Sequence, residues 1–207
     1  MNCVFIHGLG QTPESWDAVA SRLPAGLDIH RSALAAAAAE GPLTYGRLYG
    51  ALAGECGRLE GPLRLCGISL GAVLAMQYAL EEPARVDSLV LIAPQYRMPR
   101  LLLKFQNAVF RLLPRAAFRG MGFERRDVIS LTRSMGELDF TARLGELKCP
   151  ALIVCGGRDR ANRRAAEEMA RALPRAGLSI VEGAGHEVNV DAPGELSALI
   201  REAWSLG

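Results

Sequence analysis

Three residues of the sequence have the types and the local settings that nucleophilic catalysis needs. Ser69 lies between two glycines in LCGISLGAVLA (residues 65–75), after a strand-like apolar run and before an alanine-rich helical run. Asp159 follows the apolar run of LIVCGGRDRAN, and His186 follows that of IVEGAGHEVN. A hydroxyl, a carboxylate and an imidazole in this chain order can act as nucleophile, orienting acid and base in acyl transfer. The sequence therefore predicts a triad of Ser69, His186 and Asp159.

Each of these residues also has a plainer interpretation. A Gly-x-Ser-x-Gly pentapeptide arises easily by chance in a glycine-rich chain, so Ser69 alone could be a turn residue. Asp159 could only cap the helix expected to begin near Ala161, and His186 could be a loop residue. The chain has only three histidines, so one of them at a strand end among glycines favours catalysis.

A second part of the chemistry is expected at the end of the first strand, in HGLGQTPESW (residues 7–16). Backbone N–H groups gather where this glycine-rich turn enters a helix, and also at the start of the helix that begins at Leu70. We expect the N–H groups of Leu9 and Leu70 to form an oxyanion hole. His7 is interpreted as a structural residue that holds the turn, and His30 as an ordinary loop residue.

The elements that must position these residues alternate between short apolar runs and helical patterns. Several runs are apolar throughout, which is typical of parallel strands covered on both faces. Thr12 and Pro13 predict a capped start of the first helix. We expect strands at 3–7, 27–30, 63–66, 88–92, 151–155 and 178–181, and helices at 13–23, 43–59, 70–80, 161–173 and 194–204. This order predicts an α/β fold with a doubly wound, mostly parallel sheet of about six strands, whose reactive groups gather at the carboxyl ends of the strands.

The interval 94–148 breaks this alternation, because it contains no expected strand and is longer than one crossover helix requires. We interpret it as a helical cap inserted into a core formed by residues 1–93 and 149–207. Between Arg97 and Lys148, eleven Lys or Arg stand against five Asp or Glu, so the insertion is the basic part of the protein.

The insertion contains an apolar stripe, because Leu101, Phe105, Val109 and Leu112 recur at helical spacing. A helix that covers the catalytic crevice, a partner or homodimer surface and a membrane-surface helix would each bury this stripe. A cap of leucine and phenylalanine favours a substrate with an apolar acyl or alcohol part, and the arginines leave open a substrate carboxylate.

Composition narrows the classes of protein. A chain of 207 residues that is 50% hydrophobic and 22% charged fits one compact domain with an insertion. A formal net charge of +2 and 6% aromatic residues argue against a nucleic-acid partner. No run of about 18 apolar residues predicts stable membrane insertion, and residues 1–10 have no basic leader, which indicates a cytoplasmic protein. The five cysteines form no Cys-x-x-Cys pair, so neither a disulfide nor a zinc site is expected.

The motifs HGLG, GISLG, GGRD and GAGHEVN together resemble those of the α/β-hydrolase superfamily, in the branch of small carboxylesterases, enol-lactonases and carbon–carbon bond hydrolases. The resemblance spans nearly the whole chain. It implies a serine hydrolase that needs no metal or organic cofactor, with Ser69, His186 and Asp159 in the triad positions and Leu9 and Leu70 in the oxyanion positions. One departure from the family is that the antiparallel strands that usually precede the first strand are missing.

The leading hypothesis is hydrolysis of a small carboxylic ester or lactone through an acyl-enzyme. A second hypothesis keeps the triad but changes the reaction to carbon–carbon bond cleavage or acyl transfer. A third is a ligand-binding protein whose triad is idle, because the fold alone does not determine function. A probe that reacts covalently with activated serines separates the third hypothesis from the first two.

Overall fold

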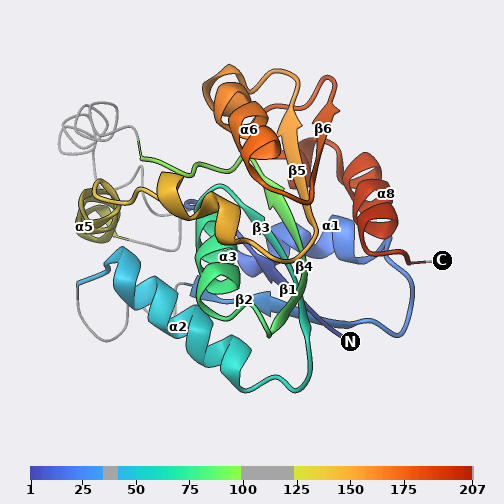
Figure 1. Cartoon of the computed structure of the whole chain (residues 1–207), viewed down its shortest axis with the longest axis horizontal. Coiled ribbons are helices and arrows are strands. Elements are labelled where there is room, and N and C mark those ends of the chain that lie inside the picture. The colour runs from blue at the N-terminus through green and yellow to red at the C-terminus, as the bar shows by residue number, and fades with distance from the viewer. Residues whose placement is uncertain (35–41, 99–123, 207) are drawn as a thin grey trace.

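The protein is built around a six-stranded sheet (Figure 1). The computed structural model describes residues 1–34, 42–98 and 124–206. The strands are β1 (Asn2–Ile6), β2 (Asp28–Ser32), β3 (Leu63–Ile68), β4 (Val86–Ile92), β5 (Ala151–Gly156) and β6 (Ala176–Val181). Their order across the sheet is β2-β1-β3-β4-β5-β6, and every neighbouring pair is parallel. The predicted α/β fold and all six expected strands are confirmed.

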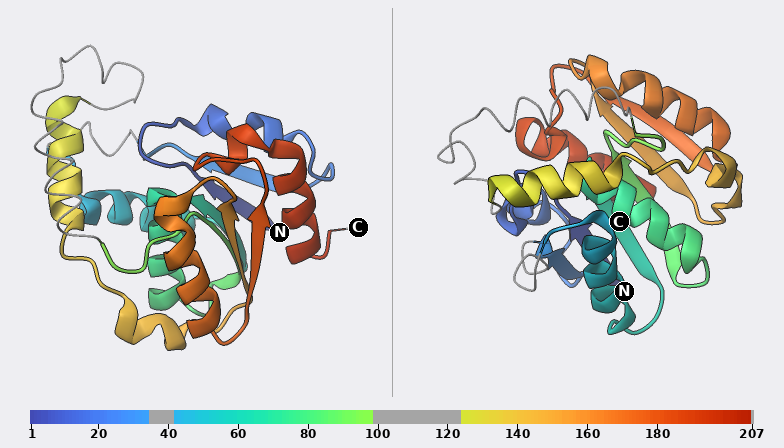
Figure 2. Two further views of the ribbon diagram at one scale, coloured as in Figure 1. Left: turned by 90° about the horizontal axis from the view of Figure 1, so that it is seen from above. Right: turned by 90° about the vertical axis from the view of Figure 1, so that its left-hand side faces the viewer.

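Helices cover both faces of this sheet (Figures 1 and 2). One face packs against α2 (Tyr45–Gly57), α3 (Leu70–Glu81) and α6 (Arg160–Ala172), and the other against α1 (Asp17–Ala20) and α8 (Pro193–Ala203). The remaining described helices are η1 (Pro13–Trp16), α5 (Arg125–Met135), η4 (Thr141–Glu146) and α7 (Val188–Asp191).

The two hydrophobic cores explain the uninterrupted apolar runs of the sequence. In β1, Val4 and Ile6 belong to the core beneath α2 and α3, whereas Cys3 and Phe5 belong to the core beneath α1 and α8. All four side chains are fully buried. Successive residues of a strand point to opposite faces, so a strand covered on both sides has no position for a polar side chain.

The start of the first helix differs from its prediction. Residues 13–23 form a single 3-10 turn, η1, followed by one turn of α-helix that ends at Ala20. Thr12 occupies the N-cap position, but its side chain makes no capping hydrogen bond. The Thr12 hydroxyl instead bonds the Glu14 carboxylate and lowers the pKa of that group. The predicted Thr12 cap is therefore wrong: the hydroxyl is directed to the Glu14 carboxylate, and its oxygen accepts no backbone N–H of the first turn.

The insertion 94–148 is described in part. Residues 99–123, which carry the apolar stripe of Leu101, Phe105, Val109 and Leu112, lie outside the described residues. In the described part, α5 packs against α2, and the Tyr45 N–H donates to Ser134 Oγ at 2.8 Å. An antiparallel bridge pairs Arg97 with Asp139. The role of this segment as a cap stays a prediction.

The close approach of α3 to the sheet depends on Gly71. A Cβ atom added there would lie closer than 3.0 Å to the backbone carbonyl oxygen of Ile6, a separation that real Cβ atoms do not show. Because the obstacle is backbone, no rotation of a side chain can relieve it. We expect Gly71→Ala to lower the free energy of unfolding by about 3 kcal/mol or more.

Gly50 provides the matched control for this substitution. It lies inside α2, and no atom lies within 4 Å of a Cβ added to it. Gly50→Ala is expected to raise the free energy of unfolding by about 0.5–1 kcal/mol, because alanine loses less backbone entropy in a helix. Urea unfolding followed by circular dichroism measures both variants. Similar stabilities for the two would contradict the tight contact at Gly71.

Candidate active site

Ser69 occupies a sharp turn between β3 and α3 at the carboxyl edge of the sheet. Its backbone has φ 54° and ψ −114°, a conformation that costs a non-glycine residue about 1–3 kcal/mol. The surrounding chain holds it there, because the Ser69 N–H donates to the Ile92 carbonyl at 2.8 Å and the Ser69 carbonyl accepts from Ala72 N–H at 3.0 Å. Gly67 and Gly71 on either side leave room for the turn. This is the strained strand-to-helix turn expected for a serine nucleophile.

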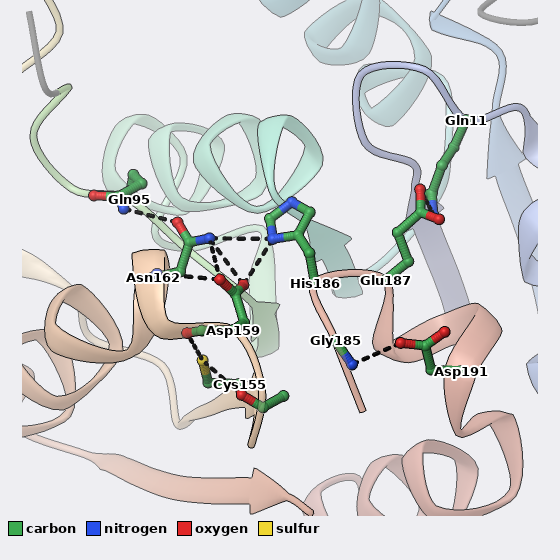
Figure 3. Close-up of polar contacts among 10 residues, drawn as sticks. Gln11, Gln95, Cys155, Asp159, Asn162, Gly185, His186, Glu187 and Asp191 are labelled. Atoms are coloured by element: carbon green, nitrogen blue, oxygen red, sulfur yellow. Dashed lines mark hydrogen bonds and ion pairs between the residues drawn. The ribbon is translucent and has the colours of Figure 1, made fainter. Parts of the chain in front are cut away.

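Asp159 and His186 meet although they follow different strands (Figure 3). Asp159 lies between β5 and α6, and His186 lies in the loop between β6 and α7. The two turns can approach because Gly156 has no side chain: a Cβ there would lie within 3.0 Å of the Gly185 carbonyl carbon. His186 Nδ1 donates to Asp159 Oδ2 at 2.7 Å, and the Asp159 side chain is only 5% exposed. The absence of a side chain at Gly156 therefore lets the turn that carries Asp159 approach the loop that carries His186.

The pKa shifts of Asp159 and His186 favour a charged carboxylate next to the imidazole. Burial raises the pKa of Asp159, but hydrogen bonds from His186 and Asn162 outweigh it, so the pKa lies below its ordinary value. The hydrogen bond to Asp159 raises the pKa of His186 above its ordinary value. Because Nδ1 donates to the carboxylate, the neutral ring carries its lone pair on Nε2. His186 can therefore accept a proton on that nitrogen.

Asn162 completes the surroundings of the acid, and the sequence interpretation missed it. Its side-chain Nδ2 lies 3.0 Å from Asp159 Oδ1 and 2.8 Å from Oδ2, and its Oδ1 accepts from Gln95 Nε2 at 2.7 Å. Its backbone N–H donates to Asp159 Oδ1 at 3.3 Å, the bond of a helix N-cap. Asp159 thus caps α6 and binds His186 at once. A polar residue three positions after a capping aspartate was the signal that could have identified Asn162.

Ser69 and His186 line the same cavity, whose volume is about 660 Å³. This lies within the range of small-molecule sites, about 300–1,000 Å³. Among the described residues, no direct hydrogen bond joins the Ser69 hydroxyl to His186. Catalytic hydrogen bonds are often long before the substrate binds. The cavity thus presents the hydroxyl and the imidazole to one bound molecule.

Leu9 and Leu70 line this cavity too. Their backbone N–H groups have no acceptor within the described part of the chain. The turn after β1 lies against the serine, since a Cβ added to Gly8 would lie 3.6 Å from Ser69 Cβ. Leu70 is the first residue of α3, where the helix dipole favours negative charge. These features support the predicted oxyanion hole.

The other two histidines lie outside this arrangement. His7 is buried, which lowers its pKa, and its Nδ1 donates to the Gly8 carbonyl at 2.9 Å. This contact agrees with the predicted structural role. His30 lies in β2, where its Nε2 contacts Asn2 Oδ1 at 3.0 Å, so the prediction of a loop residue is wrong. The predicted strand 27–30 was too short at its end, because β2 continues two residues further, to Ser32.

The cysteine thiols of the protein are not candidates for the nucleophile. The five cysteines are free and buried. Burial raises the pKa of Cys155, whose Sγ lies 3.8 Å from the Asp159 carbonyl, to about 11, so its thiol stays protonated at neutral pH (Figure 3). Within residues 1–34, 42–98 and 124–206, no cluster of three or more His, Cys, Asp or Glu side chains could hold a metal ion. No helix in those ranges is long and apolar enough to cross a membrane.

Comparisons with known proteins agree with this architecture. The sequence is 27% identical to a pimeloyl-[acyl-carrier protein] methyl ester esterase of Aromatoleum aromaticum, and the alignment covers 96% of each chain. A hydrolase from Pseudomonas aeruginosa PA01 matches the structure with a TM-score of 0.83 and 20% identity, over 98% of this chain and 89% of that one. The enol-lactonase from Burkholderia xenovorans LB400 matches with a TM-score of 0.77 and 18% identity, over 99% and 91% of the two chains. The model of the alpha/beta hydrolase family matches residues 3–199, and the chain belongs to this family.

Proposed function

We propose that the protein is a serine hydrolase that cleaves a small carboxylic ester or lactone through an acyl-enzyme. The observation that carries the proposal is the 2.7 Å hydrogen bond between His186 and Asp159 at the cavity that Ser69 also lines. A buried carboxylate bonded to the far nitrogen of an imidazole is the arrangement that prepares a serine for attack.

The mechanism follows from these positions. His186 Nε2 removes the proton from Ser69 Oγ as that oxygen attacks the acyl carbon. Asp159 holds the imidazole in the required tautomer and stabilises its positive charge. The N–H groups of Leu9 and Leu70 donate to the oxyanion. His186 then protonates the leaving alcohol, and water activated by the same nitrogen releases the acid from Ser69.

The cavity supports a substrate with an apolar part. Leu9, Leu70, Val73, Met98 and Met135 contribute apolar surface to it, and methionine adapts to ligands of different shape. The names of two relatives, a methyl ester esterase and an enol-lactonase, point to the same bond types.

One wall of the cavity is polar. Glu168 accepts from Tyr96 at 2.6 Å and pairs with Arg164 at 2.8 Å, and Arg97 also lines the cavity. Because Glu168 already pairs with Arg164, an anionic group of the substrate is expected to meet Arg97. Carboxylate-bearing and neutral esters should therefore be compared in the substrate assays.

A fluorophosphonate probe tests the proposal. We expect one covalent adduct per chain by intact mass, mapped by peptide sequencing to Ser69, because only an activated serine attacks the probe at a useful rate. Heat-denatured protein is the control and should gain no adduct. Assays with esters, lactones and thioesters then identify the bond that is cleaved. Absence of an adduct would contradict the proposal, and labelling without ester or lactone hydrolysis would favour carbon–carbon cleavage or acyl transfer.

A further inference from the structure

A buried amide, Gln11, joins the turn after β1 to the segment that follows His186. The Gln11 side chain is 8% exposed, and its Nε2 donates to Glu187 Oε1 and to Asn189 Oδ1, each at 3.1 Å. Its Oε1 accepts from the Gly8 N–H at 3.2 Å. Figure 3 shows Gln11 and Glu187 side by side, although they belong to opposite ends of the chain.

The partner amide in this network is completely buried. Asn189 is 0% exposed, and its Nδ2 lies 3.5 Å from Gln11 Oε1 and 3.2 Å from the Ser15 carbonyl oxygen. In both Gln11 and Asn189, the side-chain nitrogen donates and the side-chain oxygen accepts a hydrogen bond within the network. A buried polar network in which one member is lost leaves the others unpaired, so its geometry is held firmly.

The ends of the network lie next to the reacting groups. Gly8 precedes Leu9 and lies against Ser69, while Glu187 follows His186 directly. One side chain thus holds both the turn that carries an oxyanion donor and the loop that carries the base. Catalytic groups must keep their positions within about 0.5 Å, and a misplacement of about 1 Å can cost roughly 100-fold in rate.

We propose that Gln11 is a positioning residue that keeps the Leu9 N–H and His186 in register over Ser69. This inference rests on the proposed hydrolase function. Gln11 does not line the cavity, and its hydrogen bonds reach the site through Gly8 on one side and Glu187 on the other.

The test compares Gln11→Ala and Gln11→Glu with the wild type. The alanine variant loses every side-chain contact. The glutamate variant keeps the length and the acceptor for Gly8, but it places a carboxylate oxygen against Glu187 Oε1 and Asn189 Oδ1. Active sites are counted with the fluorophosphonate probe, so that kcat refers to competent enzyme only. We expect kcat per titrated site to fall about 10- to 100-fold in both variants with KM changed less than about threefold.

A second readout follows the transition state directly. The inhibition constant of an alkyl trifluoromethyl ketone, which forms an oxyanion on the serine, is expected to rise by the same factor as kcat/KM falls. Gln77→Ala is the control, because this amide lies on α3, bonds Glu81 and does not line the cavity. It should leave kcat and the inhibition constant unchanged. A lower melting temperature for Gln11→Ala with wild-type kcat per titrated site would overturn the proposal.

Hydrogen exchange, which does not require enzyme activity, tests this inference separately from the proposed function. If Gln11 couples the two loops, Asn189→Ala should speed hydrogen exchange of the Gly8 amide on the order of tenfold, because the acceptor of that amide loses its anchor. Unchanged exchange would overturn the coupling. Failure of the wild type to react with fluorophosphonate would sink the proposed function instead.

Discussion

Ser69→Ala is expected to lower kcat/KM for the best ester substrate on the order of 10⁴-fold or more. The substitution removes the only atom that forms a bond to the acyl group, so the residual rate reflects the oxyanion donors and substrate binding alone. Steady-state kinetics over a full range of ester concentration measure the loss. Retention of a tenth of the wild-type rate would contradict the assignment of the nucleophile.

The fold should survive this substitution. Alanine keeps the Cβ of serine, so the strain of the turn is unchanged, and the backbone bonds from Ser69 to Ile92 and Ala72 remain. The melting temperature is therefore expected to stay near that of the wild type. Ser197→Ala is the matched control, because this buried serine of α8 donates to the Gly194 carbonyl at 2.8 Å and does not line the cavity. It should leave kcat/KM intact.

Asp159→Asn is expected to lower kcat on the order of 10⁴-fold. An asparagine amide that donates to Nδ1 forces the ring proton onto Nε2. That nitrogen then has no lone pair to accept the proton of Ser69. Asparagine also caps helices well, so α6 should remain capped through the Asn162 N–H and stability should change little. Activity lost without a change in melting temperature would separate the proposed catalytic role of Asp159 from its capping of α6. Asp87→Asn, which alters a surface pair with Arg64, is the control.

The pH profile gives this variant a second signature. A protonated His186 cannot take the serine proton, so kcat/KM of the wild type should fall as the pH drops through the pKa of His186. The Asp159 hydrogen bond favours the charged ring and raises the pKa of His186 above its ordinary value. Removing the carboxylate charge should move the midpoint of the profile toward lower pH. An unmoved midpoint would show that another group controls the profile.

Much of the fold was predictable because burial on two faces leaves a plain trace in the sequence. Every strand of the sheet lies within a few residues of an apolar run. The sharp turn at Ser69 was predictable from Gly67 and Gly71, because a close approach of helix and strand requires glycine at these positions. The meeting of Asp159 and His186 was predictable from one rule, that parallel strands place their carboxyl ends at the same edge.

The supporting amides were not predictable in the same way. Gln11 bonds residues 176 and 178 positions away, and nothing in its own neighbourhood distinguishes it from a surface glutamine. The missing cap bond at Thr12 has a similar cause, since the side-chain rotamer decides whether the hydroxyl oxygen reaches the backbone N–H groups of the first turn. Periodicity reports which face is buried, whereas the pairing of polar atoms depends on distances that emerge only after folding.

The placement of the proposed machinery also has a consequence for biosynthesis. Leu9 is supplied by the connection between β1 and η1, whereas His186 follows β6, the last strand of the described residues. During synthesis, Ser69 therefore leaves the ribosome well before His186, the base proposed to activate it. Chains truncated before β6 are therefore expected to be inert toward esters, because they lack the proposed base.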